Sequence, residues 1–320
     1  MSDVHVEADR IAEILRGDNA IGTTLQGIGP SYASKILRFG LRMGDLLDWD
    51  SFLVKYDKFI QAAQVAYGVP EFDRAKELDT FRILREKMVA DNMIVDSVDW
   101  LHKARADPNK RILAEGANAC MLDVDFGTFP MVTSSNTTIG GVCTGLGVPP
   151  SAVETTVGIM KAYTTRVGGG PFPTWCQDEV GERLQSVGHE YGATTGRPRR
   201  CGWLDLNVVK YSHKINGYSS VNMTKLDVLS GIPKIEVATH YELDGRKLDG
   251  LMPHSIDDLN RCKIVTQTLD GWTEDISGCT STEQLPRNAQ DYVAFVEEQL
   301  GVPVSWVGTG PEREAMFLNA

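Results

Sequence analysis

The second half of the sequence alternates between segments typical of strands and of helices, and this alternation constrains the fold most. Residues 219–223 and 302–307 are short apolar runs that favour strands, whereas 178–190, 204–215 and 289–300 favour helices. Strands separated by helices form a mainly parallel sheet flanked by helices, an α/β architecture whose ligands bind beyond the carboxyl ends of the strands. Residues that follow these strands are therefore the first candidates for a functional site.

Local patterns predict further elements in the rest of the chain. On the first of them, Ile11, Ile14 and Leu15 have the spacing of one apolar helix face. The expected elements are helices at 7–16, 45–66, 71–106 and 151–165, and strands at 111–115 and 234–243. The first half is thus expected to be mainly helical.

Charge and hydropathy narrow the classes of function. The 320 residues include 43 acidic and 32 basic side chains, for a formal net charge of -11 at pH 7. An acidic surface repels polyanions, which argues against a nucleic-acid partner. The sequence has no run of eighteen apolar residues and no apolar leader, so we expect a soluble, cytoplasmic protein without a membrane partner. Six cysteines without a CxxC pair are expected to be free thiols, and no structural zinc is expected.

A cationic turn stands out against this acidic background. Residues 193–200 read Ala-Thr-Thr-Gly-Arg-Pro-Arg-Arg and combine three guanidinium groups with two hydroxyls. Such a composition suits the binding of several anionic groups, such as phosphates and carboxylates. An arginine-rich turn can equally be solvated surface, so the turn alone leaves both interpretations open.

A second motif follows the strand expected at 219–223. Thr224-Lys225-Leu226-Asp227 places a carboxylate where it could accept both N1–H and the exocyclic amine of guanine, while the lysine stem lies along the base. Gly308-Thr309-Gly310 ends another expected strand and could close over the same base. Both strings are short and also occur by chance.

Two further loops are rich in glycine and hydroxyl groups. In residues 21–32, a glycine-rich turn precedes a helix and is expected to expose unpaired N–H groups that suit anions, although Ile28 stands where a phosphate loop has lysine. Residues 133–141 contain seven small or hydroxyl residues, which could bind a ligand or form a solvated loop. No GxxxxGK[ST] motif occurs in the 320 residues.

Taken together, these segments resemble the adenylosuccinate synthetases in their order along the chain and in their amino-acid sequence. The matching segments are 21–24, 27–35, 115–147, 161–174, 192–206, 224–229 and 308–314. The resemblance implies a P-loop-NTPase-like α/β fold with a mainly parallel central sheet. It also implies one domain over 1–320 with a helical insertion at about 45–106. That domain would correspond to the C-terminal three quarters of the family fold, truncated at the N-terminus.

The resemblance also implies roles for individual residues. IMP contacts are implied at Thr24, Arg38, Asn118, Thr133, Val167 and Arg197. An aspartate-binding loop is implied at Ala193, Thr194, Thr195, Gly196, Arg197, Pro198 and Arg199. GTP contacts are implied at Arg199, Lys225, Leu226, Asp227, Gly308, Thr309 and Gly310. Lys35 falls in the catalytic signature, and Arg38 resembles the arginine that reaches the neighbouring subunit's site, which implies a homodimer.

The implied activity is GTP-dependent ligation of IMP and L-aspartate to adenylosuccinate through 6-phosphoryl-IMP, with Mg²⁺. The family's glycine-rich loop, Gly-Asp-Glu-Gly-Lys-Gly-Lys, supplies the base and a Mg²⁺ ligand, and a histidine supplies the acid. This loop does not occur in the 320 residues, so we assign no base, acid or metal ligand to this chain. Trp175 also stands where the family usually has glutamate, and Gln26 where a basic residue is common.

Two hypotheses follow from this pattern. In the first, the chain is an adenylosuccinate synthetase that lacks the N-terminal loop. In the second, it is a non-catalytic homologue that binds guanine nucleotide or IMP, or a partner subunit of a complete enzyme. Binding of guanine nucleotide without turnover would favour the second hypothesis.

Overall fold

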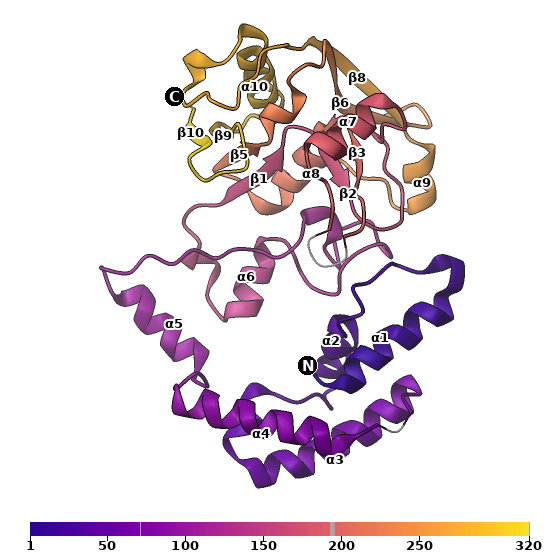
Figure 1. Ribbon diagram of the computed structural model, residues 1–320, viewed down its shortest axis with the longest axis vertical. Coiled ribbons are helices and arrows are strands. Elements are labelled where there is room, and N and C mark those ends of the chain that lie inside the picture. Colours follow the sequence, from indigo (N-terminus) through magenta and orange to yellow (C-terminus); the bar gives the residue numbers. More distant parts are fainter. Residues whose placement is uncertain (71, 193–195, 320) are drawn as a thin grey trace. The chain divides into compact units, whose positions relative to one another are not determined.

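The chain forms two compact units. The computed structural model describes residues 1–70, 72–192 and 196–319. Met1–Asp125 and Pro130–Pro150 form a first unit, here called the helical unit, and Phe126–Phe129 and Ser151–Ala320 form the sheet unit. Figure 1 shows their helices and strands, and each unit is described by itself.

Aspartate side chains begin three helices of the helical unit. The carboxylates of Asp48, Asp73 and Asp96 accept hydrogen bonds from backbone N–H groups in the first turns of α3, α4 and α5. The helices of this unit are α1 (Asp3–Arg16), α2 (Ile28–Ile36), α3 (Trp49–Tyr67), α4 (Arg74–Ala90), α5 (Ser97–Ala106) and α6 (Ile139–Leu146). The helical expectation for 45–66 and 71–106 is therefore confirmed, with breaks at the capped helix starts.

The core of the helical unit forms between α1 and α3. Phe52, Tyr56 and Phe59 of α3 are buried at helical spacing and meet Val4 and Ala8 of α1 in one cluster. Burial of side chains of this size stabilises the unit by about 1.5–3 kcal/mol each.

The predicted apolar face of the first helix is confirmed at Ile11, which packs against the buried cluster, but it was wrong at Ile14 and Leu15. Ile14 is 62% exposed and Leu15 is 80% exposed. The helix begins at Asp3, four residues before the expected start, so Val4 and Ala8 form its buried stripe. Ile14 and Leu15 lie in the last turn, outside the buried cluster.

Parallel strands form the main sheet of the sheet unit. Its order is β1-β5-β9-β10, in which β5 pairs in parallel with both β1 and β9, and β10 runs antiparallel to β9 (Figure 1). The strands are β1 (Val157–Lys161), β5 (Ser220–Thr224), β9 (Val304–Gly308) and β10 (Met316–Leu318). The mainly parallel α/β sheet expected from the sequence is confirmed.

Two smaller sheets and four helices complete this unit. β6 is the long strand of the second sheet and pairs with β4, β7 and β8, while β2 and β3 form a two-stranded sheet. These strands are β2 (Thr164–Arg166), β3 (Arg200–Gly202), β4 (Leu204–Asp205), β6 (Lys234–Leu243), β7 (Arg246–Leu248) and β8 (Lys263–Asp270). The helices are α7 (Glu179–Val187), α8 (Leu206–Asn216), α9 (Ile256–Arg261) and α10 (Arg287–Leu300).

One buried cluster joins the main sheet to α10. Val221 and Met223 of β5 and Tyr292 and Val296 of α10 are buried in it. The Tyr292 hydroxyl donates a hydrogen bond of 2.6 Å to the carbonyl of Ala162, just beyond β1. The apolar helix face thus also fixes the chain at the carboxyl end of β1.

Two expected elements were wrong. Residues 151–165 contain β1 and the start of β2 in place of a helix, because Val157–Lys161 pairs along its whole length with β5. Residues 111–115 form no strand: no neighbouring strand pairs with them in the described chain, and Leu113 is 91% exposed. Tertiary pairing decided both cases, since short apolar runs fit either element.

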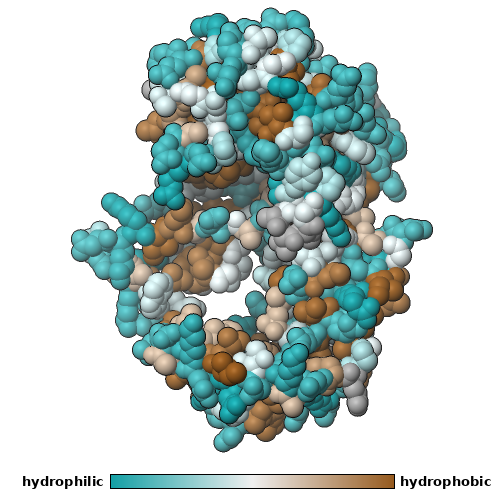
Figure 2. Space-filling model, in the orientation of Figure 1, coloured by the Kyte–Doolittle hydropathy of each residue, from teal (hydrophilic) through white to brown (hydrophobic). Residues whose placement is uncertain are grey.

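Apolar side chains also reach the surface. Ile159 of the edge strand β1 is 70% exposed and Leu318 of β10 is 67% exposed. Figure 2 shows the hydrophobic residues on one face of the molecule in brown among hydrophilic residues in teal. None of the helices in the described residues is long and apolar enough to cross a membrane.

Gly27 allows a close approach between α1 and the start of α2. Its φ is +73°, and a Cβ atom added there would lie 2.6 Å from backbone atoms of His5 and Val6. Gly68 at the end of α3 has a similar left-handed backbone, with φ of +65°, but no heavy atom lies within 4 Å of the corresponding position.

We therefore expect Gly27→Ala to lower the free energy of unfolding by roughly 2–4 kcal/mol, because it combines backbone strain with overpacking. The matched control Gly68→Ala adds the strain of a left-handed backbone alone and should cost about 1 kcal/mol. Urea denaturation of both variants measures the difference. Equal losses would show that the close approach is not a constraint.

Candidate functional site

Two predicted nucleotide motifs lie at the same edge of the main sheet. Residues 224–227 begin at the last residue of β5 and residues 308–310 at the last residue of β9, and these strands are adjacent and parallel. A Cβ atom added to Gly308 would lie 3.3 Å from the Cα of Thr224, so the two backbones pass close together there. Parallel pairing thus brings together two strings that are 81 residues apart in the sequence.

Asp227 presents a buried acceptor at this edge. In the described part of the chain, no hydrogen-bond donor reaches its Oδ1 atom, which is buried. Desolvation raises the pKa of this carboxyl above its ordinary value. Leu226 beside it is fully buried and anchors the short 3₁₀ helix Leu226–Leu229 in the core. A buried acceptor without a donor is costly, and a ligand with N–H groups would satisfy it.

The glycine-threonine-glycine string is held by its own hydrogen bonds. The Thr309 side chain is buried, and its hydroxyl donates to the carbonyl of Cys279 at 3.1 Å. Its backbone N–H donates to the carbonyl of Ala315 at 2.8 Å. A Cβ atom added to Gly310 would lie 3.0 Å from the Ala315 side chain. The string is therefore a fixed turn rather than an open loop.

Lys225 connects this edge to a buried carboxylate. Its backbone has a positive φ of 61°, and its Nζ atom donates to the carbonyl of Gly188 at 2.5 Å and to Oε1 of Glu190 at 2.9 Å. The lysine side chain thus points from the end of β5 to Glu190.

Glu190 is the centre of an ionic cluster that the sequence analysis missed. Its side chain is completely buried. Oε1 accepts from Lys161 Nζ at 2.7 Å, from Tyr163 Oη at 2.6 Å and from Lys225, and Oε2 accepts from Arg199 Nη1 at 2.8 Å. Burial raises the pKa of Glu190, but these hydrogen bonds together outweigh it and lower the pKa to about 2. The sequence signal was a single acidic residue three positions before the cationic turn.

The ends of the cationic turn are paired with each other. The Gly192 N–H donates to the carbonyl of Arg197 at 2.8 Å, and the Arg199 N–H donates to the carbonyl of Glu190 at 2.8 Å. Tyr191 and Pro198 form an isolated antiparallel bridge. Ala193, Thr194 and Thr195, which the sequence analysis assigned to aspartate binding, lie outside the described residues. The described ends of the turn, 190–192 and 196–199, are therefore held together by backbone hydrogen bonds.

Arg200 is held by aromatic rings and backbone carbonyls. Its guanidinium lies 5.8 Å from the centroid of Phe172 and 5.2 Å from that of Trp175, and Nη2 donates to the carbonyls of Gly168 and Gly169. Trp175, which was noted in the sequence as an unusual residue, thus contacts the arginine side chain. The three guanidiniums were expected to form one anion-binding cluster. The structure instead gives Arg199 and Arg200 separate partners within the sheet unit. Val167, which precedes these glycines, is 47% exposed.

In the helical unit, the chain's own carboxylates occupy the glycine-rich turn. Glu13 accepts hydrogen bonds from the N–H groups of Ile21, Gly22 and Thr23. Asp9 likewise accepts from the Gly27 N–H at 3.0 Å. The expectation of unpaired N–H groups for an external anion was therefore wrong at these positions. Thr24, within the turn, is exposed and remains accessible to a ligand.

The other predicted residues of this unit lie at loops and at a helix end. Lys35 is exposed on α2, 5.9 Å from the centroid of the Tyr32 ring, and Arg38 is exposed just after α2 with a positive φ of 68°. Asn118 is exposed and also has a positive φ. Thr133 is half-buried, and its N–H donates to the carbonyl of Leu122 at 2.8 Å.

A buried aspartate organises the hydroxyl-rich run. The Asp123 side chain is fully buried, and its Oδ2 accepts from the N–H groups of Thr137 and Thr138 at 2.6 Å and 3.2 Å. Its Oδ1 accepts from the Asp125 N–H. The run is therefore an ordered loop, as the binding interpretation requires.

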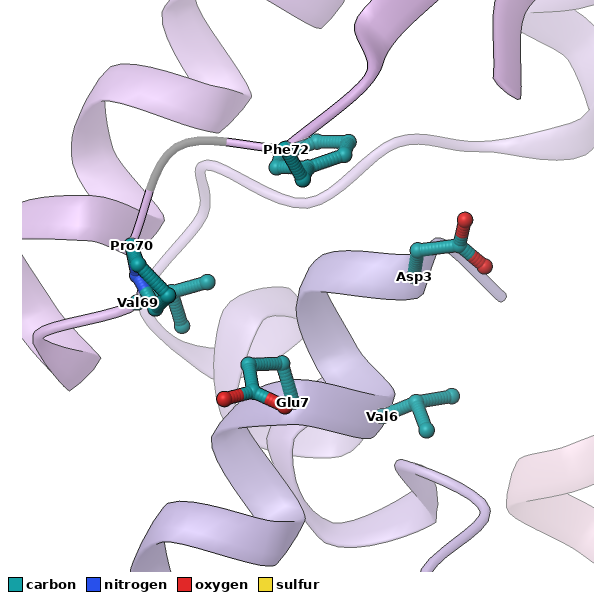
Figure 3. Close-up of a pocket in the computed structure, with 6 residues that line it drawn as sticks. All are labelled: Asp3, Val6, Glu7, Val69, Pro70 and Phe72. Atoms are coloured by element: carbon teal, nitrogen blue, oxygen red, sulfur yellow. The ribbon is translucent and has the colours of Figure 1, made fainter. Parts of the chain in front are cut away.

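A pocket in the helical unit is separate from these candidates. Its volume is about 410 Å³, and it is lined by Asp3, Val6, Glu7, Val69, Pro70 and Phe72. Figure 3 shows Asp3, Val6 and Glu7 on α1, opposite the connection between α3 and α4. None of the residues predicted to bind substrate lines this pocket, so it adds nothing to the assignment.

The lowered pKa of Glu190 predicts how the free energy of unfolding depends on pH. The folded pKa is about 2 and the ordinary value is 4.5, so ionised Glu190 stabilises the fold above the ordinary value. This contribution, on the order of 3 kcal/mol, is lost as the pH falls towards the folded value. The free-energy difference between the unmodified chain and Glu190→Gln, measured by urea unfolding, should shrink between about pH 5 and about pH 3. Exposed Glu182→Gln is the control, and a difference independent of pH would contradict the prediction.

Comparisons of this chain with known proteins match the same family. A model of the family described as adenylosuccinate synthetase matches residues 1–317. The chain is 51% identical to an adenylosuccinate synthetase of Paramecium tetraurelia over 314 residues, which is 98% of this chain and 72% of the relative. It is 50% identical to that of Candida tropicalis (strain ATCC MYA-3404 / T1) over 322 residues, or 98% of this chain and 74% of the relative.

A solved structure gives the same result for the fold. The structure of fully ligated adenylosuccinate synthetase from Plasmodium falciparum superposes with a TM-score of 0.95 and 41% sequence identity. The match covers 99% of this chain and 76% of that chain. The chain belongs to the adenylosuccinate synthetase family, whose members are ligases that form a carbon–nitrogen bond.

Proposed function

We propose that this chain acts in the GTP-dependent ligation of IMP and L-aspartate to adenylosuccinate. In the proposed reaction, GTP transfers its terminal phosphoryl group to O6 of IMP. The amine of aspartate then attacks C6, and phosphate leaves. Phosphoryl transfer of this kind depends on positioning and on cations that neutralise the developing charge, and membership of the family supports the assignment.

One observation carries the nucleotide part of this proposal. Asp227 presents a buried Oδ1 without a donor in the described residues, at the carboxyl end of β5 and beside the Gly308–Gly310 turn. Guanine offers two N–H donors on one edge, whereas adenine offers an acceptor at the equivalent ring nitrogen. The site therefore favours GTP over ATP, because ATP would leave the buried carboxylate unsatisfied.

The remaining binding roles are assigned as follows. For GTP we propose Arg199, Lys225, Leu226, Asp227, Gly308, Thr309 and Gly310. For IMP we propose Thr24, Arg38, Asn118, Thr133, Val167 and Arg197. For aspartate we propose the turn from Ala193 to Arg199, and for catalysis the exposed Lys35. Exposed Arg38 would serve the neighbouring subunit of a homodimer, and the whole chain would act as one domain with a helical insertion at about 45–106.

The family uses Mg²⁺, but the described residues do not fit such a site. They contain no group of three or more His, Cys, Asp or Glu side chains placed to hold a metal ion. The buried carboxylate of Glu190 is already occupied by three cationic groups and a tyrosine hydroxyl. We therefore assign no metal ligand to this chain and derive no step through the metal.

A second candidate function is binding without catalysis. In this case the chain would bind guanine nucleotide or IMP without turnover, or would act as a partner subunit of a catalytic chain. Binding and turnover assays on the same preparation distinguish the two functions.

Isothermal titration with GDP, together with a turnover assay with GTP, IMP and aspartate, makes this distinction. We expect GDP to bind in either case, because the base site lies within the sheet unit. Formation of adenylosuccinate selects the ligase, and binding without product selects the second candidate. Absence of GDP binding would overturn both.

The base-recognition role predicts a change in nucleotide preference. In Asp227→Asn one acceptor oxygen becomes an N–H donor, so GDP affinity should fall by roughly 10–100-fold. Xanthosine diphosphate, which has a carbonyl in place of the 2-amino group, should bind more tightly to this variant than to the unmodified chain. The control is Asp270→Asn, an exposed carboxylate on β8. Unchanged GDP affinity in Asp227→Asn would exclude the role.

A further inference from the structure

Two arginine side chains lie side by side on the two-stranded sheet of the sheet unit. Arg166 on β2 and Arg200 on β3 are register partners in an antiparallel pair, so their side chains project from the same face. Both guanidiniums donate to one acceptor, since Arg166 Nε lies 3.0 Å and Arg200 Nη2 lies 3.2 Å from the carbonyl oxygen of Gly169. Two positive charges are therefore neighbours beside one uncharged oxygen atom.

The other acceptors of these two guanidiniums are uncharged as well. Thr128 Oγ1 lies 2.9 Å from Arg166 Nη2, and the carbonyl oxygen of Gly168 lies 2.8 Å from Arg200 Nη2. In the described residues, neither Arg166 nor Arg200 forms an ion pair with an aspartate or glutamate, whereas the neighbouring Arg199 does. The pair thus keeps both of its positive charges without a carboxylate from the described chain.

Partial burial makes this excess of charge costly. Both side chains are half-buried. Desolvation and, next, the charge of Arg200 lower the pKa of Arg166 to about 10, and desolvation also lowers the pKa of Arg200. Both guanidiniums remain charged at neutral pH. A bound anion would offset their mutual repulsion and their loss of hydration.

Several N–H groups of the pair remain available to such an anion. The guanidinium of Arg200 lies 5.8 Å from the centroid of Phe172 and 5.2 Å from that of Trp175, and these contacts use its charge but none of its N–H donors. Its hydrogen bonds involve Nη2 alone, and those of Arg166 involve Nε and Nη2. Within the described residues, Nη1 of both arginines and Nε of Arg200 have no acceptor.

We propose that Arg166 and Arg200 together bind a phosphate dianion, which bridges β2 and β3. A dianion balances two guanidiniums, and its tetrahedral oxygens accept from two N–H forks at once, whereas one carboxylate would balance only half of the charge. The adjoining Gly168 and Gly169 are exposed, so a ligand reaches the site from solvent. Neither arginine is among the residues proposed for GTP, IMP or aspartate, so this inference goes beyond the proposed function.

The test compares two substitutions of Trp175, whose ring is 41% exposed beside Arg200. Trp175→Glu places a carboxylate next to the guanidinium, where it should take the place of the phosphate, and Trp175→Gln is the uncharged control of equal size. In the full 320-residue chain, about 10 mM inorganic phosphate should raise the melting temperature by roughly 2–4 °C over chloride at equal ionic strength. Trp175→Gln should keep this shift, and Trp175→Glu should lose most of it.

The difference between the two variants isolates the site, because phosphate bound elsewhere acts on both. An equal shift in both would overturn the inference, since phosphate would then act at another site or as a generally stabilising salt. No shift in the unmodified chain would also overturn it. Neither result affects the proposed ligation, which uses neither arginine, and absence of GDP binding would likewise leave the phosphate site standing.

A second pair of variants decides the question if Trp175→Glu does not fold. Arg200→Gln removes one of the two charges and should reduce the phosphate shift by more than half, whereas Arg246→Gln, at an exposed arginine on β7, should retain it. An undiminished shift in Arg200→Gln would refute the inference.

Ribose 5-phosphate in place of inorganic phosphate identifies the source of the phosphate group. A shift that both ligands produce and that Trp175→Glu loses would support a site for phosphate monoesters. A shift with inorganic phosphate alone would support a site for the free anion. A shift with neither ligand would contradict the inference.

Discussion

The parallel pairing of β5 with β1 and β9 is the constraint on which the candidate nucleotide site depends. Because three neighbouring strands run in the same direction, Lys161, Lys225 and Gly308 all lie at their carboxyl ends. Backbone N–H and C=O groups in the strands are paired, and the residues just beyond them are free to contact a ligand. The buried faces of β5 and α10 hold this arrangement in place, so a site made of short loops has a rigid foundation.

Carboxylates that accept several hydrogen bonds from nearby loops recur in this acidic chain. Glu190 gathers three cations, Asp123 holds the amides of the hydroxyl-rich run, and Asp9, together with the half-buried Glu13, holds the glycine-rich turn. In each case a fixed internal anion satisfies donors that would otherwise be available to solvent or ligand. Asp227 differs from them because one of its buried oxygens has no donor within the described chain. This difference separates carboxylates that organise loops from one suited to recognise a base.

Several elements could be predicted because local chemistry determines them. A helix was expected at 204–215, and α8 begins there, where the Asp205 carboxylate accepts the Val208 N–H. Alternation over 234–243 matched β6, and the Asp244-Gly245 turn joins it to β7. The strand at 151–165 was missed because its apolar run suits either a strand or a helix, and only pairing with β5 decides between them. Glu190 was missed for a related reason, since its cationic partners are distant in sequence.

The sequence by itself determined the family and the α/β class, and it indicated the strings that we propose to contact guanine, IMP and aspartate, because these depend on residue type and short spacing. Only the tertiary structure decided which donors and acceptors are already satisfied. It paired the turn at 21–27 with Asp9 and Glu13, divided the arginines between a carboxylate and aromatic rings, and left Asp227 Oδ1 without a donor among the described residues. The physical reason is that hydrogen-bond satisfaction and desolvation depend on contacts between segments distant in sequence, which no local pattern records.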